Sequence, residues 1–203
     1  DLQIIKNDKN LGFSGGNNVG MKLAVDKGCH YILLLNNDTR VDKGLIQELL
    51  KGIEVRGELA SPKIYFEKGC EFHKKRYLQK DLGHVLWYAG GVMNWKNVIG
   101  YHRGVDEVDT GQYDHLTATE LATGCCMLID NLVIKKIGLL DEKYFLYYED
   151  SDYSLRAKKA GFQISYVPAA FMWHQNAGSS GGSGSDLQDY FITRNRLIFG
   201  MKY

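Results

Sequence analysis

Residues 31–39 read Tyr-Ile-Leu-Leu-Leu-Asn-Asn-Asp-Thr, an apolar run followed at once by a polar cluster. A continuous apolar run of this length is typical of a strand that is covered on both faces of a sheet. The apolar spacing also predicts a strand at 2–6, a helix at 15–27 and a second helix at 42–55. Strands that alternate with helices in this way favour an α/β sandwich with parallel strands at its centre.

The chain has the composition of an ordinary globular domain. Its 203 residues, 44% of them hydrophobic and 24% charged, are enough for one domain with a buried core. The 25 Lys and Arg residues balance 24 Asp and Glu, so the net charge of +1 argues against a nucleic acid partner. No apolar run reaches the roughly 18 residues that span a bilayer, and no signal-peptide pattern opens the chain. The four cysteines include no Cys-x-x-Cys pair, which disfavours a zinc site, and we expect a cytoplasmic location.

The second half of the chain is less regular than the first. Its patterns predict a helix at 150–159 and strands at 87–93, 116–120, 121–130 and 162–167. Pro168 is expected to end the last of these strands. Residues 178–185 contain only Gly and Ser, which is typical of a flexible loop, and 186–203 has helical spacing. We expect this C-terminal helix to pack on the domain, with a position on a membrane surface as the alternative.

Two polar stretches follow predicted strands near the start of the chain. Asn36, Asn37 and Asp38 come directly after the strand at 31–35, where ligands of open α/β sheets bind. Asp38 could hold a divalent metal, and the asparagines could bond a sugar or nucleotide; a helix-capping turn is the alternative. Residues 10–18 are Gly- and Asn-rich but lack the glycine spacing of dinucleotide-binding and P-loop motifs. Such a loop could still approach an anionic or hydroxyl-rich ligand closely.

Two further groups of residues suggest chemistry. Glu149 and Asp152 share one face of the helix expected at 150–159, whereas Asp150 points elsewhere. One of these carboxylates could act as a base while the others bind neighbours or acceptor hydroxyls, although all three could simply cap the helix. His174, which follows an aromatic run, is either a core residue or a partner of Asp38 in a site for Mg²⁺ or Mn²⁺.

Five motifs occur in a fixed order along the chain. They are Asn-Leu-Gly-Phe-Ser-Gly-Gly-Asn-Asn at 10–18, Leu-Leu-Leu-Asn-Asn-Asp-Thr at 33–39, Ala-Gly-Gly at 89–91, Thr-Gly-Cys-Cys-Met-Leu-Ile at 123–129 and Phe-Leu-Tyr-Tyr-Glu-Asp-Ser-Asp-Tyr at 145–153. Together with His174 and Arg194-Asn195, which follow them, the series resembles the family 2 glycosyltransferases of GT-A fold, in particular the rhamnosyltransferase-like branch that builds bacterial polysaccharides. The resemblance covers essentially the whole chain. It implies one GT-A (Rossmann-like) domain at 1–203, an α/β/α sandwich with a mostly parallel central sheet.

The resemblance also implies roles for individual residues. Residues 36–38 take the place of the family's Asp-x-Asp motif, with Asp38 as a metal ligand and Asn37 near the nucleotide. His174 matches a metal-binding histidine, so the implied cofactor is Mg²⁺ or Mn²⁺. Contacts with the nucleotide-sugar or the acceptor are further implied for Asn17, Gly90, Gly91, Thr123 and Gly124.

The implied reaction is the transfer of a sugar with inversion. Asp150 matches the family's catalytic base and would take the proton of an acceptor hydroxyl, with Glu149 and Asp152 in supporting or acceptor-binding roles. The metal would stabilise the departing diphosphate. The expected donor is a UDP-, dTDP- or GDP-linked sugar, with rhamnose suggested by the branch. The expected acceptor is a growing polysaccharide or a lipid-linked saccharide, which would place the protein at the inner face of the membrane.

Two other functions remain open at this point. The chain could be a non-catalytic, degenerate transferase module that binds glycan or a partner in a polysaccharide assembly complex. A metal-dependent nucleotidyltransferase would want a basic residue in the loop at 10–18, and that loop has none. Members of the resembling family also begin with an additional strand, helix and strand that grip the nucleotide base. This chain opens after that unit, so we expect donor binding that is weak or absent.

Overall fold

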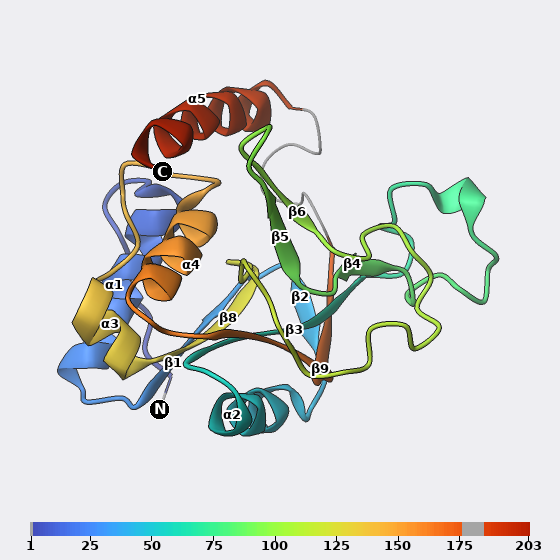
Figure 1. Cartoon of the computed structure of the whole chain (residues 1–203), viewed down its shortest axis with the longest axis horizontal. Helices are drawn as coiled ribbons and strands as arrows, with labels where there is room; N and C mark the ends of the chain where they lie inside the picture. Colours follow the sequence, from blue (N-terminus) through green and yellow to red (C-terminus); the bar gives the residue numbers. More distant parts are fainter. Residues whose placement is uncertain (1, 176–184) are drawn as a thin grey trace.

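The fold is built on a seven-stranded sheet of order β1-β8-β3-β9-β2, with β4 paired to β3 and β7 to β9, and a separate β5-β6 hairpin (Figure 1). The computed structural model describes residues 2–175 and 185–203. The strands are β1 (Tyr31–Leu35), β2 (Thr39–Val41), β3 (Leu59–Phe66), β4 (Leu86–Tyr88), β5 (Gly91–Asn94), β6 (Ile99–His102), β7 (Thr117–Ala118), β8 (Cys126–Asp130) and β9 (Ile164–His174). The helices are α1 (Gly12–Asp26), α2 (Leu45–Val55), α3 (Asn131–Ile137), α4 (Glu149–Lys159), α5 (Asp186–Lys202) and the 3-10 turn Lys74–Arg76.

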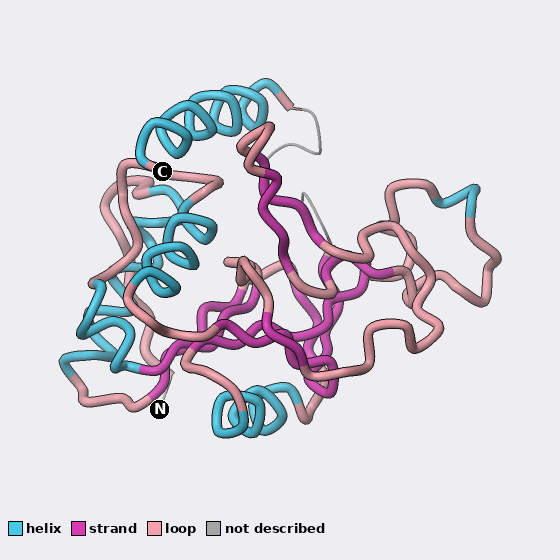
Figure 2. The backbone as a smooth tube through the Cα atoms, in the orientation of Figure 1, coloured by secondary structure: helices cyan, strands magenta, loops and turns pink. Residues whose placement is uncertain are grey.

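Helices cover both faces of the sheet, as the predicted sandwich requires (Figure 2). On one face, α2 contributes Leu45, Leu49 and Ile53, whose spacing of four residues forms a single apolar stripe against the sheet. On the other face, a second buried cluster joins side chains of α1, α3 and α4, among them Met21, Val133 and Tyr153. The α/β class is therefore confirmed, and the sheet is the layer that both cores share.

The direction of strand pairing is more mixed than the sequence predicts. The central pair, β3 with β9, is parallel, in agreement with the expectation for the centre of the sheet. The flanking pairs β1–β8, β3–β8 and β2–β9 are antiparallel, so parallel pairing makes up less of the sheet than the expected mostly parallel arrangement. An antiparallel pair needs no helical crossover between its strands. Strand β8 can therefore pair with β1 and β3 although an irregular segment, and no helix, comes directly before it.

Three local predictions were wrong. The strand expected at 87–93 is instead two strands, β4 and β5, which pair with β3 and β6 and are separated by Ala89 and Gly90. Residues 2–6 form no strand, and Leu2 and Ile4 are 93% and 85% exposed. An apolar run becomes a strand only when a neighbouring strand accepts its backbone hydrogen bonds. Pro168 does not end β9, which continues to His174; the register with β3 shifts there, so that Pro62 opposes Val167 and Lys63 opposes Phe171. Proline is tolerated at such a bulge because the bulged residues leave the hydrogen-bond ladder.

The C-terminal helix forms as predicted and packs on the domain. Its buried side chains are Asn195 and Phe199, and the ring of Phe199 contacts those of Trp95 and Tyr148. The Gly/Ser run at 178–185 lies outside the described residues except for Ser185, which caps α5. Within the described part of the chain, no helix combines the length and apolar character that crossing a bilayer requires.

Candidate functional site

The two predicted metal ligands meet where β2 and β9 pair. His174 Nε2 lies 3.3 Å from Asp38 Oδ1, and the side chains are only 7% and 16% exposed. The backbone holds them together, because Thr39 is the ladder partner of His174 and the Gln175 N–H donates to the Asp38 carbonyl oxygen at 2.9 Å. Residues far apart in sequence are thus joined by strand register.

The chemistry of this pair fits a divalent cation. His174 Nδ1 is buried without a hydrogen-bond partner, and the buried Asp38 Oδ1 has no contact of hydrogen-bond geometry besides its 3.3 Å approach to His174 Nε2. Burial lowers the pKa of His174, against the opposing effect of Asp38, and this direction favours the neutral imidazole, the form that offers a lone pair to a metal. A carboxylate and an imidazole suit Mg²⁺ or Mn²⁺. No group of three or more His, Cys, Asp or Glu gathers among the described residues, so water and substrate phosphates would complete the coordination, as is usual for Mg²⁺.

A row of rings extends from His174 toward the interior. The Trp87 ring lies 4.6 Å from that of His174 and 4.3 Å from that of His102, between centroids. The His102 Nδ1–H donates to the Trp87 carbonyl oxygen at 3.0 Å, and burial lowers the pKa of His102 to about 4. Sequence reasoning missed both residues, because they lie in the irregular region and belong to no motif.

The predicted base, Asp150, lies at the first turn of α4. Its Oδ2 accepts the Gly124 N–H at 3.0 Å, and its Oδ1 accepts the Ser151 N–H at 2.7 Å. Burial raises the pKa of Asp150, while these backbone donors oppose the shift. A Cβ at Gly124 would stand 2.9 Å from the Phe13 ring, so a larger residue there would require that ring to shift. The structure thus brings the predicted 123–124 loop and Asp150 together, with a carboxylate tuned toward proton uptake.

The turn before Asp150 is strained and clamped from α5. Three residues other than glycine adopt positive φ there: Phe145 at 62°, Tyr147 at 67° and Tyr148 at 72°. The amide of Asn195, which is fully buried, donates to three carbonyl oxygens of this segment at 2.7–2.8 Å, those of Tyr144, Leu146 and Tyr147. Backbone strain of this kind persists only where surrounding contacts enforce it, and it clusters at functional sites. Asn195 was not among the predicted site residues.

The two other predicted carboxylates have different surroundings. Glu149 is buried, its Oε2 has no hydrogen-bond partner, and burial together with the charge of Asp150 raises its pKa well above the ordinary value. Asp152 is also buried, but it faces the C-terminal end of α5 and the side of α4 away from the cavity. Its partners are Arg156 at 2.7 Å, Lys202 at 2.6 Å and Tyr203 at 2.8 Å. Asp152 therefore fastens α5 to α4.

The glycines at the start of the β5-β6 hairpin allow a close approach of backbones. A Cβ at Gly90, whose φ is +105°, would lie 2.8 Å from the Arg103 guanidinium. A Cβ at Gly91 would lie 2.6 Å from the Leu121 carbonyl oxygen. Gly91 borders the cavity described below. Both glycines thus let the hairpin lie directly against the segment that leads to β8.

The remaining predicted ligand contacts are less concentrated. Asn17 donates to the Phe13 carbonyl oxygen at 2.9 Å and borders a separate depression between α1 and β1. Asn37 is exposed beside Asp38. The Thr123 hydroxyl is buried and accepts the Cys125 N–H within its own loop. Asn37 therefore lies beside the Asp38–His174 pair and Gly124 beside Asp150, whereas Asn17 lies at a different depression.

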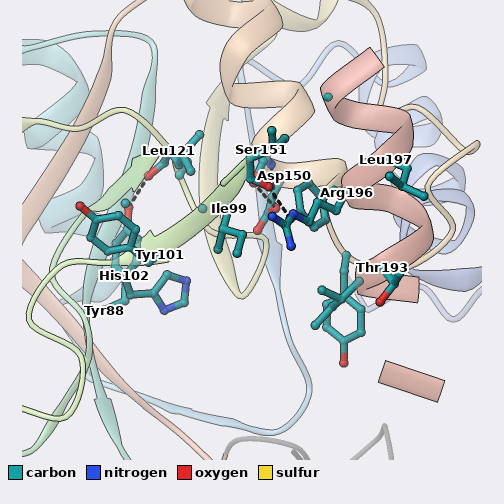
Figure 3. Close-up of a pocket in the computed structure, with 18 of the residues that line it drawn as sticks. Tyr88, Ile99, Tyr101, His102, Leu121, Asp150, Ser151, Thr193, Arg196 and Leu197 are labelled. Carbon is teal, nitrogen blue, oxygen red and sulfur yellow. Dashed lines mark hydrogen bonds between the residues drawn. The ribbon is translucent and has the colours of Figure 1, made fainter. Parts of the chain in front are cut away.

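The metal pair and the base flank the same short segment. The Asn36 N–H, two residues before Asp38, donates to the Cys125 carbonyl oxygen at 3.0 Å, and Asp150 Oδ2 accepts the N–H of Gly124, the residue before Cys125. Burial raises the pKa of the Cys125 thiol, and the charges of Asp38 and Asp150 add to this shift. Beside Asp150, a cavity of about 680 Å³ opens between the β5-β6 hairpin, the turn before α4, and α5 (Figure 3). A carboxylate–imidazole pair that could hold a cation, together with a half-buried carboxylate at a cavity, would be suited to moving a group from an anionic donor to a nucleophile.

Comparison with solved structures agrees with this architecture. The chain resembles GalNAc-T7, whose crystal structure contains UDP, GalNAc and Mn²⁺, with a TM-score of 0.62 and 14% identity. The match covers 94% of this chain and 35% of GalNAc-T7. This likeness confirms the GT-A fold that the motifs implied.

Curated relatives are also transferases. The chain is 26% identical over 200 residues to the low-salt glycan biosynthesis hexosyltransferase Agl10 of Haloferax volcanii, covering 98% of this chain and 60% of that protein. It is 23% identical to the galactofuranosyltransferase GlfT2 of Mycolicibacterium smegmatis, covering 98% of this chain and 31% of that protein. A shorter stretch, 59 residues at 41% identity, matches the N-acetylglucosaminyl-diphospho-decaprenol L-rhamnosyltransferase of Mycobacterium tuberculosis, 29% of this chain and 19% of that protein. The chain therefore spans only part of each of these relatives.

Two family models match overlapping parts of the chain. The one described as Glycosyl transferase family 2 matches residues 1–129. The one described as Glycosyltransferase like family 2 matches residues 94–200. Since each covers more than half of the sequence and both agree with the predicted resemblance, the chain belongs to glycosyl transferase family 2.

Proposed function

We propose that the chain is the catalytic part of a glycosyltransferase that moves a sugar from a nucleotide-sugar to an acceptor hydroxyl in glycan biosynthesis. The observation that carries this proposal is the pair of centres on either side of Cys125. Asp150 is a half-buried carboxylate with a raised pKa beside a cavity, and Asp38 with His174 would form a cation half-site. A non-catalytic module would have no need to keep both.

The carboxylates support an inverting mechanism. Asp150 would accept the proton of the acceptor hydroxyl while the oxygen attacks the anomeric carbon from the face opposite the nucleotide. A retaining double displacement needs a second carboxylate as a nucleophile. Glu149 is buried with a strongly raised pKa, and Asp152 is engaged by Lys202 and Arg156. Neither is available for that role, so a single direct displacement fits this chain.

Asp38 and His174 would bind the nucleotide-sugar donor through a metal ion. These residues would hold Mg²⁺ or Mn²⁺, and a cation there stabilises the charge that develops on the departing diphosphate. A UDP-, dTDP- or GDP-linked sugar supplies such a diphosphate. We infer rhamnose as one candidate sugar, because the relative from Mycobacterium tuberculosis is named an L-rhamnosyltransferase.

The acceptor would be a saccharide or a lipid-linked saccharide, and the reaction would take place in the cytoplasm at the inner face of the membrane. The relative's name includes a diphospho-decaprenol acceptor, and this supports the lipid-linked alternative.

Replacing the base tests the function most directly. Asp150→Asn should abolish sugar transfer yet retain Mn²⁺-dependent binding of the nucleotide, measured by calorimetry with UDP, dTDP and GDP. Asp38→Asn should weaken that binding. Asp26→Asn, at an exposed position at the end of α1, is the matched control and should change neither. Transfer by Asp150→Asn at close to the normal rate would refute the base assignment, and wild-type protein without Mn²⁺-dependent nucleotide binding would favour the non-catalytic module.

A further inference from the structure

The loop between β3 and β4, residues 67–85, concentrates positive charge that the balanced chain as a whole lacks. The loop's 3-10 turn, Lys74–Arg76, lies at its outer end, across the longest axis of the molecule from α3 (Figure 1). We call residues 67–85 the basic loop. Two of its carboxylates, Glu67 and Asp81, lie outside the stretch 68–80. Within that stretch, a single carboxylate, Glu71, accompanies five basic side chains: Lys68, Lys74, Lys75, Arg76 and Lys80.

The neighbouring carboxylates leave most of this charge uncompensated. Glu71 is buried, and it accepts the N–H of Gly69 at 2.8 Å and that of Gly83 at 2.7 Å. Asp106 binds Arg76 at 2.8 Å. In the described part of the chain, no ion pair is found for the other four basic side chains, all exposed: Lys68, Lys74, Lys75 and Lys80. The basic loop therefore presents four lysine charges to the solvent.

Contacts with the rest of the domain hold the basic loop in a fixed shape. The Tyr77 hydroxyl donates to the Asp106 carbonyl oxygen at 2.9 Å, and the Trp173 indole N–H donates to the Gly83 carbonyl oxygen at 3.0 Å. The two hydrogen bonds of Glu71 join the beginning of the loop to its end. A surface that is already ordered loses little conformational entropy when it binds a partner.

Two large apolar side chains stand among these lysines. Phe72 is 48% exposed, although its ring packs on that of the buried Phe66 with 4.8 Å between centroids. Leu78, two residues after the 3-10 turn, is 63% exposed. At a membrane surface, lysines bind anionic headgroups while apolar side chains enter the boundary with the acyl chains. A soluble acidic partner would explain the lysines but would give Phe72 and Leu78 no apolar surface to cover them.

We propose that the basic loop binds an anionic lipid surface. The four lysines would lie among the headgroup phosphates, and Phe72 and Leu78 would enter the interface below them. The membrane location proposed above rests on the name of a relative and assigns no surface of this chain to the lipid. The present inference rests on the loop itself and stands without the transferase assignment, since neither a nucleotide nor a metal takes part in it.

Co-sedimentation of the whole chain with lipid vesicles tests this inference. We expect binding to vesicles of phosphatidylcholine mixed with phosphatidylglycerol, weakened by salt, and little binding to phosphatidylcholine alone. The double variant Lys74→Gln/Lys75→Gln should bind the mixed vesicles about 30-fold more weakly, since each lysine contributes about a fivefold factor. Leu78→Ser should weaken binding about tenfold. The matched control is Lys135→Gln/Lys136→Gln, which removes the same charge from two adjacent exposed lysines on α3 and should bind normally.

Other outcomes overturn the inference. Equal binding to both kinds of vesicle would show that the loop does not recognise negative charge. An equal loss in the two double variants would show that the net charge of the chain, and not the basic loop, drives binding. Poly-aspartate that binds as tightly as the mixed vesicles, with no effect of Leu78→Ser, would assign the loop to an acidic protein. Absence of vesicle binding overturns this inference alone, and absence of Mn²⁺-dependent nucleotide binding overturns the transferase proposal alone.

Discussion

Asn195 should be a positioning residue for the base, although it touches no substrate. Its amide has two protons, which serve the three carbonyl oxygens of residues 144–147. At a net contribution of about 0.5–1.5 kcal/mol for each of two full hydrogen bonds, Asn195→Ala should lower the unfolding free energy by about 1–3 kcal/mol. The turn stores strain of about 1 kcal/mol or more in each of its three left-handed residues.

The hydrogen bonds of Asn195 and the backbone strain of the turn are of similar energy. Once the amide is removed, the turn should therefore relax to a less strained backbone conformation. Asp150 follows this turn directly, and a displacement of about 1 Å at a catalytic group can cost about 100-fold in rate. We therefore expect Asn195→Ala to lower kcat by about 10- to 100-fold with the donor KM nearly unchanged. Asn195→Asp, which keeps the shape but loses the amide protons, should behave alike.

The assay is steady-state kinetics over a pH series, with thermal unfolding of the same samples. Asn131→Ala is the matched control, because Asn131 is also buried and donates to the Cys29 carbonyl oxygen at 2.9 Å, on α3. It should lose stability without a comparable loss of kcat. If Asn195→Ala unfolds at a lower temperature but keeps kcat within about twofold, or if Asn131→Ala loses as much kcat, the positioning role is refuted.

Three further predictions concern Asp150 and two residues beside it, Gly124 and Glu149. Gly124→Ala should lower kcat and reduce the unfolding free energy by about 1–3 kcal/mol. The added Cβ would push on the Phe13 ring and move the N–H that Asp150 accepts. Steady-state kinetics and thermal unfolding test this prediction, and an unchanged kcat would contradict it. The acid limb of a kcat/KM–pH profile should lie above the ordinary carboxyl range, since the base must lose its proton and burial raises the pKa of Asp150; a limb near pH 4 would contradict it. Glu149→Gln should raise Tm at pH 7–8 more than at pH 5. Burial raises the pKa of Glu149 in the folded state, so as pH rises above the pKa of the unfolded state, the unfolded chain loses this proton first and the folded state loses stability. The glutamine has no such proton, so its gain in Tm grows with pH. Equal gains in Tm at pH 5 and at pH 7–8 would exclude this cause.

Part of the candidate site could be predicted from the sequence, because its residues directly follow a strand whose pattern is clear. The cluster at 36–38 follows a strand whose bounds the structure reproduces, Tyr31–Leu35. Asp150 and Gly124 were both singled out, and the structure joins them by a hydrogen bond. Periodicity and turn residues are local signals, so they place an element and its ends with some success.

The rest depended on contacts that local signals do not encode. Trp87 and His102 reach the site because β4 and the β5-β6 hairpin fold back over it, and these short strands are set by long-range pairing. Arg196 faces the cavity because Asn195 and Phe199 fix the rotation of α5 on the domain. The run at 2–6 shows the converse case, since strand-like residues remain unpaired where no neighbour is described.

The error at Pro168 is the one that explains the site. A strand that ended at Val167 would leave His174 in a loop, with no ladder to hold it near Asp38. Instead β9 passes through a bulge, pairs with β3 again from Phe171 onward, and reaches β2, where Thr39 fixes His174 in register. A bulge inserts residues that the partner strand does not match, so it re-aims every side chain beyond it. The close approach of Asp38 and His174 is thus a product of the irregularity in β9, and the local rule for proline fails at the place where this pair, the proposed metal site, is formed.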